Sequence, residues 1–286
     1  MKFGFGSSAE KNGIPHIERV APTAAIPGGE ITIHGRGFVS SAQPRPVVRF
    51  GEAEASIALA SENRLVARVP EGANGGVVRV ATAGHESQPH PVHIGLQIAD
   101  NLHPVANPAV DLDGNIYVTF SGPRGHVATG IAFDHNGNLY VGDRSGTVFK
   151  ISPSREIFVF ATLEPSIAAY HLAFHPSGDL YVSGPTTSSF DRIHRITQGG
   201  DVSVFFRGLG RPQGLALDRD GNLYVAGSYA GRRGIVRITP QAQAEVVLSG
   251  SGIVGMALQP SGRAILATTE ALFTLDWDVR GLPLIG

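Results

Sequence analysis

The chain of 286 residues contains no cysteine, one tryptophan and few charged residues, which make up 16% of it. The lack of cysteine excludes disulfide bonds, thiolate metal sites and a cysteine nucleophile. The formal net charge is −1 and the lysines and arginines form no block, whereas a protein that grips phosphate backbones needs clustered positive charge. No apolar run approaches the roughly 20 residues needed to span a bilayer. These absences predict no nucleic-acid partner and no membrane insertion.

The first 13 residues are polar, contain Gly and Ser, and lack the apolar segment of a signal peptide. We therefore expect a disordered lead-in over residues 1–12. The location that this predicts is the cytoplasm, or export without a visible leader.

Glycine and proline are abundant, at 37 and 19 residues, and the apolar runs are short. Many tight turns between short apolar runs are typical of an all-β chain. Between Ile14 and Ile94 apolar and polar residues alternate in six or seven short segments, which suits a β-sandwich. The clearest predicted strands span residues 17–20, 30–34, 47–50, 57–60, 64–69 and 77–81.

Four motifs in this part of the chain occur in the order found in one known family. They are IERVAP at 17–22, PGGEITIHGRGF at 27–38, VRFG at 48–51 and LVARVP at 65–70. Residues 13–95 thus resemble an IPT/TIG domain, which implies an immunoglobulin-like sandwich that serves as a spacer or docking module and carries no catalytic residues. We expect Phe38 to fill the core. Turns with positive φ are expected at the glycines of the second motif, namely Gly28, Gly29, Gly35 and Gly37.

A segment of ten residues recurs five times in the second part of the chain. The copies are AVDLDGNIYV at 109–118, AFDHNGNLYV at 132–141, AFHPSGDLYV at 173–182, ALDRDGNLYV at 216–225 and ALQPSGRAIL at 257–266. From copy to copy the chain advances by 23, 41, 43 and 41 residues, counted between Asp111, Asp134, His175, Asp218 and Gln259. A period near 42 residues with four strands per unit predicts a β-propeller of about five blades over residues 96–286.

The first step of this repeat is 23 residues against 41 for the next, so it is short by roughly two strands. We therefore expect a first blade that is short or irregular, and a ring that is irregular or incompletely closed at that point. The segment 92–102 is an alternative source of one outer strand for this blade.

The repeat resembles the NHL and SMP-30/gluconolactonase propellers, through PQGLALDRDGNLYV at 212–225 and TGIAFD at 129–134. The resemblance implies one divalent cation at the mouth of the central channel, held by oxygen ligands, carboxylates among them, that precede the innermost strands. The matching residues here, which we call the mouth positions, are Ala106, Thr129, Tyr170, Gln213 and Val254. None is a carboxylate, although a hard cation needs several such oxygens. We therefore predict no metal and no cofactor, with Ca²⁺ or another divalent cation only if the protein is a lactonase.

Two copies of the repeat contain an Asp-x-Asp-x-Asn pattern, at 111–115 and at 218–222. The pattern resembles part of a calcium-binding loop, but hairpin tips use Asp and Asn in the same places to satisfy turn amides. No Gly-x5-Glu sequence follows, so we favour the turn.

Arg232 and Arg233, together with Tyr229, are expected in a protruding loop between two strands of one blade. Arg and Tyr are enriched at protein interfaces, so the segment is interpreted either as a contact with a partner protein or as a solvated loop.

These observations favour a binding or scaffold protein over an enzyme, and no catalytic residue is assigned. The propeller mouth would recognise a peptide, a glycan or a small ligand, since concave centres suit ligands, and the partner would be a protein, a glycan or a small molecule. The residues predicted to line the mouth are Asn107, Thr129, Tyr170, His171 and Gln213. The alternative is a metal-dependent lactone hydrolase of the gluconolactonase type, with its metal near Gln213 and His171. A purely structural fragment with a truncated propeller is a third hypothesis.

Overall fold

The computed structural model describes residues 14–39, 45–102, 107–111, 113–118, 130–168, 170–187 and 190–282. Within these ranges the chain is all-β and contains no helix, so no described helix is available that could cross a membrane. The chain divides into two compact units, the first ending at Ile94 and the second beginning at Gly95. The predicted boundary lies one residue later. The predicted lead-in over residues 1–12 lies outside the described residues.

The first unit is built from ten strands in its described part. They are β1 (His16–Ala21), β2 (Ala24–Ala25), β3 (Glu30–Arg36), β4 (Val47–Phe50), β5 (Ala53–Ala60), β6 (Arg64–Arg68), β7 (Val77–Thr82), β8 (His85–Glu86), β9 (His90–Pro91) and β10 (His93–Ile94). Antiparallel pairs join them in the order β1-β3-β6-β5-β4-β7-β8, with β9 also on β7. The short strands β2 and β10 pair in parallel.

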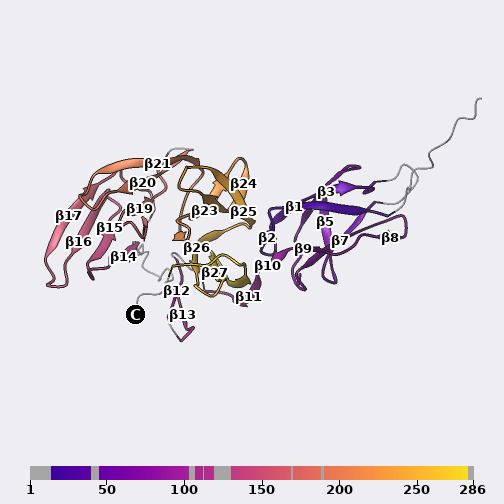
Figure 1. Cartoon of the computed structure of the whole chain (residues 1–286), viewed down its shortest axis with the longest axis horizontal. Coiled ribbons are helices and arrows are strands. Elements are labelled where there is room, and N and C mark those ends of the chain that lie inside the picture. The colour runs from indigo at the N-terminus through magenta and orange to yellow at the C-terminus, as the bar shows by residue number, and fades with distance from the viewer. Residues whose placement is uncertain are drawn as a thin grey trace, which may run out of the picture. The chain divides into compact units, whose positions relative to one another are not determined.

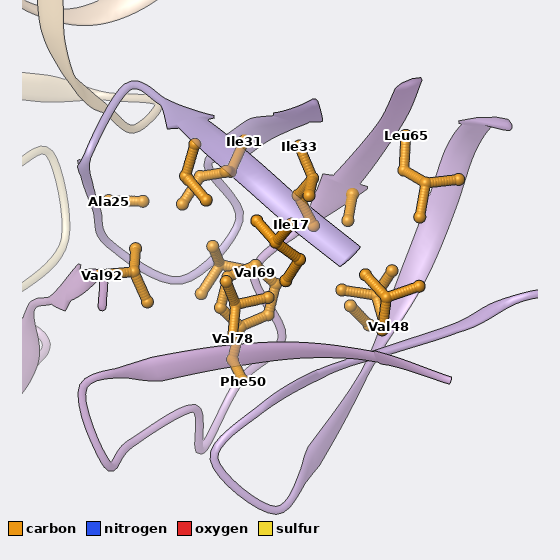
Figure 2. Close-up of a cluster of buried hydrophobic side chains, with 14 of the residues drawn as sticks. Ile17, Ala25, Ile31, Ile33, Val48, Phe50, Leu65, Val69, Val78 and Val92 are labelled. Carbon is orange, nitrogen blue, oxygen red and sulfur yellow. The ribbon is translucent and has the colours of Figure 1, made fainter. Parts of the chain in front are cut away.

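Strand β5 lets this single run of strands form two layers. Its beginning, Ala53–Ala55, pairs with β4, whereas Ser56 and the residues after it pair with β6. Alternate residues of β3, β4, β6 and β7 point inward, as expected for strands with one buried face. Figure 2 shows the enclosed core, in which Ile33, Phe50 and Leu65 are fully buried.

Phe38 is fully buried in this core, as predicted. Of the turn glycines, Gly28 and Gly37 have the expected positive φ, of 80° and 71°. Gly29 and Gly35 do not have a positive φ, and Gly35 is required for a different reason. A Cβ atom at Gly35 would overlap the carbonyl oxygen of His16 and approach the Phe38 ring to 2.6 Å. The glycine therefore allows the Phe38 ring and strand β1 to approach β3.

When only the described strands of the second unit are counted, they form four antiparallel groups of four strands and one pair. Three four-stranded sheets use consecutive strands, namely β14 (Ile131–Phe133), β15 (Leu139–Gly142), β16 (Thr147–Ile151) and β17 (Ile157–Thr162); β18 (His171–Phe174), β19 (Leu180–Ser183), β20 (Asp191–Ile196) and β21 (Val202–Leu209); β22 (Leu215–Leu217), β23 (Leu223–Tyr229), β24 (Arg232–Ile238) and β25 (Ala244–Ser249). Figure 1 shows these sheets following one another. Their first strands β14, β18 and β22 lie side by side, which is the arrangement around the axis of a β-propeller.

The last four-stranded sheet corrects one prediction. It has the order β11-β28-β27-β26, with β11 (Leu96–Ala99), β26 (Ile253–Leu258), β27 (Arg263–Thr268) and β28 (Leu272–Asp276). The segment suggested as an outer strand of the first blade thus completes the last blade, because Leu96 and Gln97 pair with Thr274 and Phe273. The beginning of the unit is thereby bound to its end.

The first blade is short in the described chain, as predicted. It consists of β12 (Ala109–Val110) and β13 (Ile116–Tyr117), which pair with each other. Ile116 and Val118 pack against Val254 and Leu272 of the last sheet, so this small sheet is anchored on that side.

The loop expected around Tyr229, Arg232 and Arg233 is absent. Strands β23 and β24 stay paired up to a two-residue turn, across which Tyr229 pairs directly with Arg232. The turn residues Ala230 and Gly231 both have positive φ, 49° and 78°, which matches the twist of a tight hairpin. Arg232 and Arg233 are therefore the first two residues of strand β24 and not part of a loop.

Candidate functional site

The mouth positions form hydrogen bonds between successive blades. Gly130 N donates to the carbonyl of Tyr170 at 2.7 Å, and Gly214 N donates to the carbonyl of Val254 at 3.0 Å. Ser183 Oγ donates to the carbonyl of Gln213 at 2.5 Å. The backbone carbonyls at three mouth positions thus join one sheet to the next.

These positions do not fit the divalent cation that the gluconolactonase resemblance implies. A hard cation needs several oxygen ligands, yet the three carbonyls accept hydrogen bonds and no described mouth position is a carboxylate. Within the described ranges no three His, Cys, Asp or Glu side chains are close enough together to hold a metal. We derive no chemical step through a metal.

Tyr170 and His171 are buried between sheets. The Tyr170 hydroxyl donates to the carbonyl of Glu164, and burial, with the charges of Glu164 and Asp143, raises its pKa to about 12. In the repeat, His171 occupies the position that is glycine in other blades, namely Gly130, Gly214 and Gly255. It is 4% exposed, and its burial lowers its pKa to about 4. The imidazole is therefore neutral at physiological pH.

Asn107 connects two blades. Its Nδ2 donates to the carbonyl of Leu215 at 2.8 Å, and its Oδ1 accepts from Met256 N at 3.2 Å. Because Leu215 and Met256 belong to neighbouring innermost strands, the amide satisfies backbone groups that have no further strand to pair with. Thr129, the remaining residue predicted at the mouth, lies outside the described residues.

Gln213 is the predicted residue that lines a pocket, of about 310 Å³. Its backbone is fixed, since Gln213 N donates to the carbonyl of Ala226 at 2.8 Å. Its side chain is half-buried and forms no hydrogen bond with any residue that the structure describes. The amide is therefore available to a ligand. We call this cavity the Gln213 pocket; Arg211, Ser228, Arg233, Ile253 and five glycines form the rest of its wall.

The Gln213 pocket is cationic. Arg211 and Arg233 line it, and no Asp or Glu does. In the described part of the chain neither guanidinium forms an ion pair or a side-chain hydrogen bond. Seven other arginines pair with carboxylates, for example Arg192 with Glu164 and Arg263 with Asp276.

Arg211 also has an unusual backbone, with φ of 48°. Left-handed conformations are uncommon for residues other than glycine and concentrate at ligand sites when they do occur. Arg211 precedes Pro212, which disfavours the right-handed helical region for it. Sequence analysis missed Arg211, although the run Gly208 to Gln213, where β21 ends, contains two glycines and a proline.

The hairpin tips, formed by the turn between the first two strands of each blade, confirm the turn interpretation of the Asp-x-Asp-x-Asn pattern. Asp218 Oδ1 accepts from Asp220 N and Asn222 N, at 2.9 and 2.8 Å. Its Oδ2 accepts from Asn222 Nδ2 and the Tyr224 hydroxyl, at 2.8 and 3.0 Å. The same four bonds recur around Asp111 and Asp134. These carboxylates are occupied by the turn.

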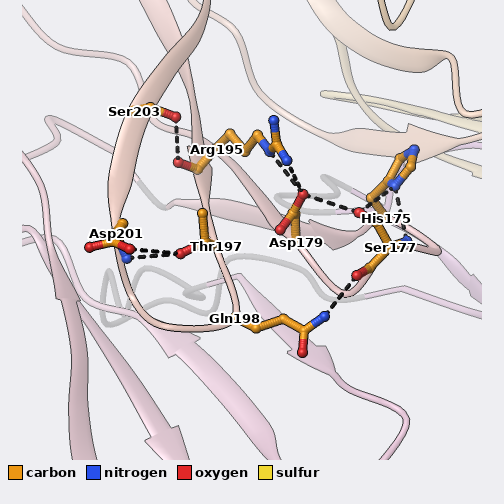
Figure 3. Close-up of polar contacts among 8 residues, drawn as sticks. All are labelled: His175, Ser177, Asp179, Arg195, Thr197, Gln198, Asp201 and Ser203. Atoms are coloured by element: carbon orange, nitrogen blue, oxygen red, sulfur yellow. Dashed lines mark hydrogen bonds and ion pairs between the residues drawn. The ribbon is translucent and has the colours of Figure 1, made fainter.

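One tip reaches the same result with other residues (Figure 3). His175 Nδ1 accepts from Ser177 N at 3.1 Å, in the role that Asp Oδ1 has elsewhere. Ser177 Oγ donates to Asp179 Oδ2, which also forms an ion pair with Arg195. His175, Ser177 and Asp179 therefore stabilise the turn, and their spacing of two residues follows from that role.

The sandwich of the first unit has a match among known families. Residues 15–90 match the IPT/TIG domain. This confirms the resemblance for the first part of the chain, while the NHL and SMP-30 features of the second part stay a prediction. No curated protein matches the chain.

Several solved structures are similar to the chain at low sequence identity. An auxiliary nutrient binding protein from Bacteroides thetaiotaomicron is 15% identical, with a TM-score of 0.40 over 90% of this chain and 65% of its own. A candidate gluconolactonase is 17% identical, with a TM-score of 0.44 over 73% of this chain and 87% of its own. Virginiamycin B lyase from Staphylococcus aureus is 15% identical, with a TM-score of 0.40 over 86% and 91%. No function is transferred at this similarity.

Proposed function

We propose that the second unit is a binding module whose ligand is a small anion, a molecule bearing a carboxylate or a phosphate, held in the Gln213 pocket. The observation that carries the proposal is the pair Arg211 and Arg233, which line one cavity without any acidic neighbour in its wall. Guanidinium groups bind carboxylates and phosphates with two parallel hydrogen bonds. One such anion could accept hydrogen bonds from both the Arg211 and the Arg233 guanidinium groups.

The size and the other groups of the pocket support a small molecule. About 310 Å³ is at the lower end of the volumes that hold drug-sized ligands. The free Gln213 amide offers both a donor and an acceptor, which suits a ligand with hydroxyl groups beside its charge. The IPT/TIG sandwich then serves as a spacer or docking module, and the two domains extend over residues 13–95 and 96–286.

Titration calorimetry on the full chain tests the proposal with three probes, namely inorganic phosphate, glucose 6-phosphate and uncharged glucose. We expect binding of the two phosphates that weakens as salt is added, because exposed charges are screened. Glucose should not bind. Each of Arg211→Gln and Arg233→Gln should weaken phosphate binding at least about tenfold, the effect of losing one charge-assisted hydrogen bond.

Arg219→Gln is the matched control. Arg219 is an exposed arginine at the hairpin tip between β22 and β23, and its removal changes the net charge by the same amount without touching the pocket. Binding that Arg219→Gln weakens as much as the pocket variants would show a non-specific charge effect and refute the proposal. Turnover of gluconolactone that depends on added Ca²⁺ would favour the hydrolase instead.

A further inference from the structure

One face of the sheet β14–β17 is mostly apolar, with only the pair Thr147 and Thr162 polar at one end, and no described part of the chain covers it. Cross-strand pairs join Ile131 to Val141, Phe149 and Val159 in one row. A second row joins Phe133 to Leu139, Ile151 and Ile157. Residues directly opposite each other in an antiparallel sheet point to the same face, so these eight side chains form one surface, which we call the open face. No charged side chain belongs to it.

The four outer members of the open face are strongly exposed. The exposed fractions are 60% for Ile131, 53% for Phe133, 66% for Ile157 and 65% for Val159. Single exposed apolar residues are common, but a contiguous exposed apolar surface marks a contact. The opposite face of the same sheet is different, because Tyr140 and Val148 are buried there against the next sheet.

The first blade does not cover the open face in the described structure. Ile116 and Val118 of β13 and its neighbour pack on the last sheet instead, and Tyr117 is exposed. Figure 1 shows β14–β17 at the end of the row of four-stranded sheets, with no other four-stranded sheet beyond it. The open face is thus a blade surface of the kind that another blade covers elsewhere in this propeller.

We propose that the occupant is the open face of a second copy of this chain, so that two copies pair sheet on sheet around a two-fold axis. An isologous contact needs a surface that is complementary to itself, and a sheet face that is mostly apolar and has no charged side chain meets that requirement. Two such sheets pack about 10 Å apart with interdigitated side chains.

The area is sufficient for a reversible dimer. Side chains of this size present about 150–200 Å² when fully exposed, so the four outer residues offer about 400 Å² per copy at the exposed fractions given above. With the half-buried inner residues, two copies bury about 1,000 Å², the lower limit of specific interfaces. We therefore expect a dissociation constant in the micromolar range.

Sedimentation equilibrium of the full chain over a concentration series tests this inference. Wild type should pass from one to two chain masses. Val159→Lys and Ile131→Lys should each weaken the dimer at least about tenfold, because a charge in an apolar contact is costly. Phe158→Lys is the matched control, since Phe158 is 51% exposed on the same strand but pairs with Lys150 on the opposite face; it should leave the dissociation constant within about threefold.

A second measurement does not depend on the folding of charged variants. The chain has no cysteine, so single replacements by Cys at Ile131, Val141, Phe149 and Val159 each introduce one thiol. Mild oxidation should link two chains at the position nearest the axis, where Cα atoms come within about 7 Å, and should not do so for Phe158→Cys. A wild type that stays at one chain mass at every concentration would overturn the proposal. So would a dimer that is equally strong in all lysine variants and is cross-linked at none of the four positions.

Discussion

His171 should make the second unit lose stability as the pH falls from about 6.5 to about 4. Its ordinary pKa is 6.5, and burial lowers the pKa to about 4 in the folded chain. Between these values the unfolded chain binds a proton that the folded chain does not, so the free energy of unfolding falls as the pH is lowered. At about 1.36 kcal/mol per pH unit the full loss is about 3 kcal/mol. We expect His171→Gln to lack this loss.

Trp277 reports this change selectively. It is the single tryptophan, it is buried in the second unit, and its ring meets Tyr224 edge to face with centroids 5.6 Å apart. Urea titrations followed by its fluorescence give the free energy of unfolding of that unit. Between pH 7.5 and pH 4.5 the wild type should lose about 2–3 kcal/mol more than His171→Gln. His135→Gln controls for the loss of a histidine at an exposed position.

Parallel pH curves for wild type and His171→Gln would refute the reasoning. They would mean that His171 has the same proton affinity in the folded and the unfolded chain. Two other groups do not interfere. The pKa of His194 is lowered as well, mainly by burial, and contributes equally to both proteins. Asp134 also has a lowered pKa, but the stability that it contributes is present above pH 3.8 and is lost only below that value.

Three further changes test how the blades are held. Asp218→Ala should destabilise the second unit by about 2–4 kcal/mol in the same fluorescence assay, because four donors lose a buried acceptor; a cost below that of Tyr224→Phe, which removes one of the four bonds, would contradict this. Gly214→Ala should lower the melting temperature measured by circular dichroism, because its Cβ would lie 2.5 Å from Gly255 Cα, whereas Gly199→Ala, with nothing nearer than 3.7 Å, should not; equal melting temperatures would count against the close approach. Ser183→Ala should cost about 1–3 kcal/mol, since the carbonyl of Gln213 loses a buried donor, and unchanged urea midpoints would exclude that role.

The sequence predicted the strands well because local patterns decide them. Turn residues and alternation located β4 with its observed bounds and β7 to within one residue. In the blades, the repeat placed its five copies on five successive inner hairpins, because every blade repeats a turn of the same kind. Long-range pairing carries no such local signal. That is why β11 was considered for the first blade although it pairs with β28 at the opposite end of the unit.

The candidate site was predicted less well, for a physical reason. Position in the repeat says which residues lie near the axis, but not which of their atoms are already used. The Tyr170 hydroxyl already donates a hydrogen bond to the carbonyl of Glu164. Both the nitrogen and the oxygen of the Asn107 side-chain amide already bond to backbone groups. Gln213 differs because its side chain is left without a partner among the described residues.

Both proposals concern groups that the contacts common to all blades do not use, and this follows from how a repeat stabilises a propeller. Residues common to the blades serve the blades, as Asp218 holds its tip and the mouth carbonyls hold neighbouring sheets. Groups that take no part in these shared contacts remain available. Arg211 and Gln213 lie in the segment between β21 and β22, and the short step of 23 residues before Asp134 leaves the open face beside a two-stranded sheet. In this chain the residues outside the shared contacts are therefore those from which binding is to be expected.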